Sequence, residues 1–176
     1  LVNAWFASDK SSVSFSASAT KDLYDDDGNQ IEFNIHSVYI IYLWRTSTEL
    51  TTRYITYYKL RCDSSSLVCT NTSNTGYSGL KGLQFYTLQA QIGYLSADKS
   101  PVSGSATSQL LYDENGNAIV FETGKTYTIH DVFDIYGDSI NPGYLEHWSL
   151  FDSSGMLYWN TSQYFSQILY IQYTVS

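Results

Sequence analysis

The sequence predicts an all-β chain that folds as an antiparallel β-sandwich. Segments with the two-residue alternation of apolar and polar side chains follow one another along its 176 residues. Turn-forming residues separate these segments at intervals of about 8–12 residues, the spacing typical of sandwiches. No window has the i, i+3, i+4 apolar stripe and end caps of a helix.

The strands are expected where the alternation is clearest or where aromatic and β-branched residues are densest. The longest apolar run, VYIIYLW, suits one buried strand, and no run of 18 apolar residues exists that would span a membrane. The expected strands are 11–19, 38–44, 51–61, 83–95, 126–136, 144–151 and 163–175.

One phrase of eleven residues occurs twice, as LYDDDGNQIEF at 23–33 and as LYDENGNAIVF at 111–121. Seven of the eleven positions are identical. Each copy contains Asp-Gly or Asn-Gly, which supply the positive φ angles of a type I′ turn. Apolar residues alternate after each turn, so each copy is predicted to form a β-hairpin.

The similarity extends beyond the phrase. The tripeptide SAT precedes both copies, and IHSVYIIY at 35–42 matches IHDVFDIY at 129–136 in five of eight positions. An internal duplication explains these blocks, whereas convergence on good turn chemistry explains only the dipeptides. Because no linker divides the halves, one sandwich domain is expected at 21–176, after an N-terminal segment at 1–20.

Composition excludes some functions. The chain has 9 basic and 17 acidic residues and a net charge of −8, so the basic surface of a nucleic-acid-binding protein is absent. Ser and Thr make up 41 residues and Tyr 17. A surface of hydroxyl groups keeps its character when carboxylates protonate. Such a composition fits an acidic or otherwise harsh exterior.

The chain does not begin with Met, and we expect that a leader has been removed and that the mature protein is extracellular. Its cysteines, Cys62 and Cys69, are too few for a four-ligand metal site. They favour a disulfide, which requires an oxidising compartment, over two buried thiols.

Two tripeptides match the N-glycosylation signal, at Asn71 and Asn160. With 9 Asn and 41 Ser or Thr, chance alone gives about two such matches. Their placement is more informative than their number. Asn71 lies in a polar segment that contains glycine, and Asn160 lies at a plausible turn, so N-linked glycans are expected at both.

No motif of an enzyme or a metal site stands out. His36 and His130 occupy matching places in the two similar blocks, but a third ligand is lacking. Residues 25–29 resemble the start of a calcium loop without its remaining ligands, so a solvated hairpin turn is favoured. Asp131 and Asp134 are not singled out as a glycosidase pair. We therefore expect no enzymatic activity, no cofactor and no metal.

The chain is rich in Ser, Thr and Tyr, is predicted to be all-β, and has N-glycosylation signals and an alternating N-terminal segment. In these respects it resembles the subunit of the archaeal thread, a surface filament of Sulfolobus-type organisms. The resemblance implies a type I pilin-like fold, subunits joined by donor strand complementation, and heavy glycosylation. The expected partners are therefore identical subunits.

The N-terminal residues Leu1, Val2, Asn3, Ala4, Trp5 and Phe6 are the expected donor strand. Val2, Ala4 and Phe6 can line one face, while Leu1 and Trp5 lie on the other. A polar break at 8–10 follows. We expect the segment to leave its own domain and to add a strand to a neighbouring subunit. The competing interpretation is an ordinary first strand, paired within its own chain.

Two classes of function remain open at this point. The first is a structural subunit of a cell-surface filament that serves adhesion. The second is a secreted carbohydrate-binding module that stacks sugars on tryptophan, although core packing is the ordinary role of each such ring. The candidate platforms are Trp5, Trp44, Trp148 and Trp159.

Overall fold

The structure is a computed structural model in which residues 1–16, 20–32, 34–46, 50–51, 58–63, 66–71, 77–105, 107–136, 145 and 147–176 are described. Between residues 46 and 77 this description covers the backbone and not the side chains. Apart from the 3₁₀ conformation of Leu145 and His147, the regular elements in these ranges are β-strands, and each strand pairing whose register is described is antiparallel. The predicted all-β fold is therefore confirmed.

The chain divides into two compact units, Leu1–Leu88 (unit 1) and Gln89–Ser176 (unit 2). The boundary expected after residue 20 does not coincide with this division. Residues 83–95, expected as one strand, contain the end of one strand and the start of another, with Ala90 between them. The sequence gives no sign of this break because neither Pro nor a turn dipeptide marks it.

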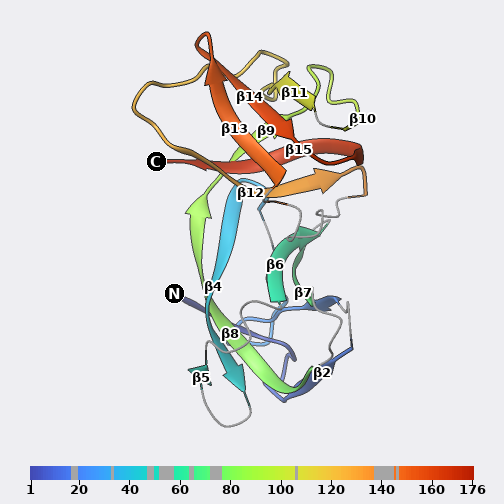
Figure 1. Ribbon diagram of the computed structural model, residues 1–176. Coiled ribbons are helices and arrows are strands. Elements are labelled where there is room, and N and C mark those ends of the chain that lie inside the picture. Colours follow the sequence, from blue (N-terminus) through green and yellow to red (C-terminus); the bar gives the residue numbers. More distant parts are fainter. Residues whose placement is uncertain are drawn as a thin grey trace. The chain divides into compact units, whose positions relative to one another are not determined.

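Unit 1 is built around the long strand β8, Tyr77–Gln89. One edge of β8 pairs first with β2 and then with β1, and the other edge pairs with β4 (Figure 1). A second sheet has the order β3-β7-β6. The remaining strands of the unit are β1 (Val2–Trp5), β2 (Val13–Phe15), β3 (Thr20–Asp22), β4 (Ser37–Thr46), β5 (Leu50–Thr51), β6 (Tyr58–Asp63) and β7 (Ser66–Asn71).

Unit 2 is built in the same way around β15, Phe165–Val175. One edge of β15 pairs with β10 and β9, and the other with β12, which lies beside it in Figure 1. Its second sheet has the order β11-β14-β13. The remaining strands are β9 (Gln91–Tyr94), β10 (Val102–Gly104), β11 (Thr107–Leu110), β12 (Tyr127–Asp134), β13 (Trp148–Ser153) and β14 (Met156–Thr161).

Except for β5, which has no counterpart among the described strands of unit 2, the two units correspond strand by strand and in register. Val13 pairs with Leu80 in unit 1, and Val102 pairs with Ile168 in unit 2. Each residue of β15 lies 88 positions after its counterpart in β8. The buried positions of the central strands also match. They are Leu80, Leu83 and Phe85 in β8, and Ile168, Ile171 and Tyr173 in β15.

Each unit has its own apolar core. In unit 1 it contains the central side chains of the first sheet together with Leu23, which follows β3. In unit 2, side chains from both sheets meet, as in a β-sandwich. There Trp148 and Trp159 of the second sheet contact Phe165 of β15 at ring-centroid distances of 5.0 Å and 5.2 Å.

The repeated phrase forms a hairpin turn in each unit, but the predicted turn type is wrong. A type I′ turn needs positive φ at both central residues. Here Gly28 is the residue of its turn with a positive φ, +82°, and its N–H donates to the carbonyl oxygen of Asp25 at 3.1 Å. The turn is therefore type I, followed by a left-handed glycine. Gly116 also has a φ of +82°, and its N–H donates to the carbonyl oxygen of Asp113.

The carboxylate of the first turn residue favours this geometry. Asp25 Oδ1 accepts the N–H groups of Asp27 and Asn29 at 2.9 Å each. Asp113 Oδ1 accepts those of Asn115 and Asn117 at 2.9 Å and 3.0 Å. Side chains that hydrogen-bond the backbone two residues ahead stabilise a turn of this kind.

The block 129–136 is not the structural counterpart of 35–42. The Tyr39 hydroxyl accepts the N–H of Asn34, and the Tyr127 hydroxyl accepts that of Glu122, both at 2.9 Å, so Tyr127 corresponds to Tyr39. His36 lies in the turn before β4, whereas His130 lies within β12. The two histidines thus do not occupy equivalent places.

We expect Gly116→Ala to destabilise the protein more than Gly155→Ala. Both glycines have left-handed φ angles, +82° and +77°, which cost an alanine about 1–2 kcal/mol. A Cβ at Gly116 would also lie 2.7 Å from the carbonyl oxygen of Ala97, whereas nothing lies within 4 Å at Gly155. The extra crowding costs about 1–3 kcal/mol. Denaturant unfolding of both variants measures the difference, and equal losses would contradict the close approach.

Candidate functional site: the N-terminal strand

The N-terminal segment forms β1, an edge strand that pairs with β8 of its own unit. The register joins Val2 to Phe85 and Ala4 to Leu83. The expected alternation is present, since Ala4 is 1% exposed and Phe6 4% exposed in the core. Val2 lies at the end of the inward row and is 46% exposed. In the single chain, β1 thus has the place of an ordinary first strand.

Several contacts hold the end of β1. The Phe6 ring stacks on Trp44 at a centroid distance of 6.0 Å, and burial of such a side chain contributes about 1.5–3 kcal/mol. Trp5 and Tyr24 exchange two backbone hydrogen bonds of 2.8 Å, on the side of β1 that faces away from β8. Gln84 Nε2 donates to Asn3 Oδ1 at 3.0 Å.

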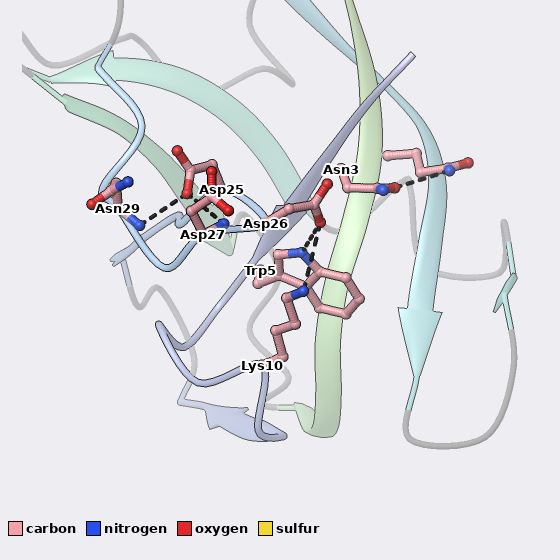
Figure 2. A network of polar contacts seen from close by, with 8 residues as sticks. Asn3, Trp5, Lys10, Asp25, Asp26, Asp27 and Asn29 are labelled. Carbon is pink, nitrogen blue, oxygen red and sulfur yellow. Dashed lines mark hydrogen bonds and ion pairs between the residues drawn. The ribbon is translucent and has the colours of Figure 1, made fainter.

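A polar network surrounds the Trp5 indole (Figure 2). Trp5 Nε1 donates to Asp26 Oδ1 at 2.8 Å, and this bond is the main cause of the lowered pKa of the Asp26 carboxyl. Lys10 Nζ lies 3.9 Å from the same carboxylate oxygen and 5.2 Å from the Trp5 ring centroid. The Arg45 guanidinium lies 5.0 Å from that centroid. The network ties the end of β1 to the hairpin turn and to β4.

The turn after β1 has the sequence SDKS, and ADKS recurs after β9. Lys10 and Lys99 adopt left-handed φ angles of 63° and 61°. Asp98 Oδ1 accepts the hydroxyl groups of Ser100 and Ser96 at 2.6 Å each and the N–H of Ser100 at 3.0 Å. These bonds lower the pKa of Asp98 to about 2, with the Ser100 hydroxyl as the largest cause.

The residues of this network did not stand out in the sequence. The sequence pattern places Lys10 in a polar break and Asp26 in a turn, and indicates no contact between them. The sequence did contain one signal of this network, because the tripeptide DKS occurs at 9–11 and again at 98–100. A turn motif that is repeated together with a repeated hairpin indicates that the turn and the hairpin are in contact. Among the described residues, no group of three His, Cys, Asp or Glu side chains is placed to hold a metal ion.

The side chains of Cys62 and Cys69 lie outside the described part of the chain, but their backbones pair within the β6–β7 hairpin. The register places Cys62 opposite Leu67 and Cys69 opposite Leu60. Such diagonal neighbours lie about 7–8 Å apart. A disulfide usually needs Cα atoms within about 6.8 Å, so this register does not support the expected bridge.

The two glycosylation signals lie in strands. Asn71 is the last residue of β7, and its side chain is outside the described set. Asn160 lies within β14 rather than at a turn, because the chain turns at 154–155 instead. Its amide oxygen accepts the Ser149 hydroxyl in an exposed hydrogen bond, and the neighbouring Thr161 is 3% exposed.

The tryptophans are mostly core residues. Trp44 and Trp159 are fully buried, and Trp148 is 6% exposed and stacks on Trp159 at a centroid distance of 5.0 Å. Trp5 is partly exposed but has two cations over its ring. Three of the four candidate sugar platforms are therefore inaccessible.

Comparisons with known proteins give no relative: no family model, no curated protein and no solved structure matches the chain. Within the described residues, the chain forms no helix of the length and apolarity that crossing a bilayer requires.

We expect Asp98→Asn to lower the melting temperature at pH 6 and to have little effect near pH 1.5. The folded-state pKa of Asp98, about 2, lies below its ordinary value of 3.8. The ionised form therefore stabilises the fold above about pH 4, and this contribution is lost as the pH falls through 2. Melting curves of both proteins between pH 1.5 and 6 test this, and a difference that does not vary with pH would contradict it.

Proposed function

We propose that the protein is a structural subunit of an extracellular, cell-surface filament, assembled head to tail by donor strand complementation with β1 as the donor. The observation that carries the proposal is the position of β1. It is an edge strand that supplies the buried side chain of Ala4 to the core of its unit, and Phe6, directly after it, supplies a second. A strand of identical sequence from a second copy would make the same contacts.

Withdrawal of β1 would leave unit 1 incomplete. The edge of β8 at 82–85 would lose its partner, and the core beside Trp44 would lose the Phe6 ring. An open strand edge over an open core favours pairing with another chain. Each such contact joins different surfaces of two copies, and contacts of this kind propagate as a fibre where the rotation between copies does not close into a ring.

The turn between β1 and β2 favours such an exchange. Lys10 holds a left-handed φ angle of 63°, which costs a non-glycine residue about 1–2 kcal/mol. Straightening the segment between Phe6 and Val13 would release this strain, and strained hinges promote strand exchange. The equivalent strand of unit 2, β9, is less free to leave its place, because only Ala90 separates it from β8.

The surface supports an adhesive role for the filament. Tyr42, Tyr136 and Tyr164 are 49%, 72% and 74% exposed. Tyrosine rings combine apolar contact area with a hydrogen-bonding hydroxyl, as interfaces often require. The alternative, a carbohydrate-binding module, is less well supported because its tryptophans are buried or covered by cations.

Two covalent modifications would accompany an extracellular location. The first is a Cys62–Cys69 disulfide, which would need the β6–β7 pairing to shift by two residues from the register Cys62–Leu67. The second is N-glycosylation at Asn71 and Asn160.

Deleting residues 1–9 should abolish filaments while leaving a subunit that the peptide Leu1–Asp9 restores as a stable monomer. Loss of β1 removes the donor, and the peptide fills the vacant place on β8 without linking two subunits. Electron microscopy and melting curves measure both effects. Leu1→Ser, at a position 72% exposed, is the control and should assemble normally. Filaments of the truncated protein would show that β1 is not the donor.

Native material should carry more glycan at Asn71 than at Asn160. Asn160 is paired on both sides within its sheet, with Ser108 of β11 and Ser149 of β13, so a glycan on its amide nitrogen would crowd its neighbours, whereas Asn71 lies at the end of its strand. Peptide mapping by mass spectrometry gives the occupancy of each site. Full occupancy at Asn160 with an unmodified Asn71 would contradict this expectation.

A further inference from the structure

The two units offer two equivalent places for a first strand, one on β8 and one on β15. In unit 1, β1 pairs with residues 82–85. In unit 2, β9 pairs with residues 170–173. The registers correspond position by position, since Ala4 lies opposite Leu83 and Gly93 lies opposite Ile171. The side chains at these positions can therefore be compared directly.

The inward position differs between the units. Ala4 is 1% exposed and packs in the core of unit 1. Its counterpart in unit 2 is Gly93, and a Cβ there would lie 3.0 Å and 3.1 Å from the two terminal methyl carbons of Leu111. Leu111 is fully buried and cannot move into solvent. An alanine there would require the Leu111 methyl groups to shift by a few tenths of an ångström, so unit 2 fits glycine better than alanine at this position.

At the next position, on the outward face, the central strand of unit 1 has the smaller residue and that of unit 2 the larger one. Trp5 lies opposite Gly82, and a Cβ at Gly82 would collide with the carbonyl oxygen of Ala4. β1 thus lies so close to β8 that only glycine fits there. In unit 2 the equivalent residue is Tyr170, whose ring lies 5.9 Å from that of Tyr94.

Tyr170 is also held in place from its other side. Its ring stacks on Phe133 at a centroid distance of 4.9 Å. A strand with the sequence of β1 would have to take the place of β9, which leaves room for the side chain of Tyr170, and would bring the Ala4 methyl group to about 3.0 Å and 3.1 Å from the terminal methyl carbons of Leu111. The contact with Leu111 therefore disfavours β1 in the place of β9.

We propose that β1 is sterically specific for β8 and is rejected by β15. It docks on β8 of its own chain or, resting on the proposed function, on β8 of a second copy. The specificity-determining residues are Ala4 of β1, Gly82 of β8, and Leu111 of unit 2. In a filament, the first unit of each subunit is then the acceptor, and the second unit keeps its own strand β9.

Photo-crosslinking of the full-length chain tests this specificity. A photoreactive benzoylphenylalanine replaces Asn3, whose side chain lies on the outward face beside Gln84. Mixing ¹⁵N-labelled and unlabelled chains under assembly conditions separates crosslinks within a chain from those between chains. We expect crosslinks to map to β8, at residues 82–86, and not to residues 168–174 of β15.

The outcomes distinguish the steric specificity of β1 from donor strand complementation. Crosslinks to β8 between chains support both of them. Crosslinks to β8 within one chain support the specificity and contradict donor strand complementation. Crosslinks to β15, in the same chain or in another, overturn the specificity, as does a lack of any crosslink to β8.

A pair of full-length variants tests the steric cause. Gly82→Ala should reduce crosslinking to β8 at least tenfold, because its Cβ occupies the place of the Ala4 carbonyl oxygen. Gly104→Ala is the matched control, since a Cβ there would meet Phe165 at an ordinary 3.6 Å. Wild-type crosslinking in Gly82→Ala would overturn the assignment of Gly82.

Discussion

The close approach of each hairpin turn to the turn that follows the first strand is the constraint on which the other contacts depend. A Cβ at Gly28 would lie 2.8 Å from the carbonyl oxygen of Ser8, and one at Gly116 would lie 2.7 Å from that of Ala97. With the hairpin held so near, Tyr24 can pair with Trp5 on the side of β1 away from β8. The repeated phrase therefore fixes the first strand of each unit between a hairpin and a central strand.

This shared framework supports the hypothesis of an internal duplication, because strand order, register and turn hydrogen bonds agree between the units. In this shared framework, the side chains that contact the first strand differ between unit 1 and unit 2. Unit 1 combines Ala4 with Gly82, whereas unit 2 combines Gly93 with Leu111 and Tyr170. Two units of similar fold can thus differ in the first strand that each accepts.

The sequence predicted those features that depend on local chemistry. Asp-Gly and Asn-Gly located both hairpins, and the alternation of Ala4 and Phe6 located the inward face of β1. The turn type was wrong because the Asp25 and Asp113 carboxylates bind the backbone and favour a type I turn. The break at Ala90 and the roles of Gly82 and Gly93 could not be predicted, because each depends on which distant strand lies opposite.

Cryo-electron microscopy of assembled material tests the central claim most directly, because it shows which copy each N-terminal strand completes. The account predicts filaments in which Ala4 and Phe6 of one subunit lie against Leu83 and Trp44 of the next, in the register that β1 has with β8 in the single chain. Filaments in which every β1 pairs with its own β8, or material that stays monomeric under all assembly conditions, would contradict it.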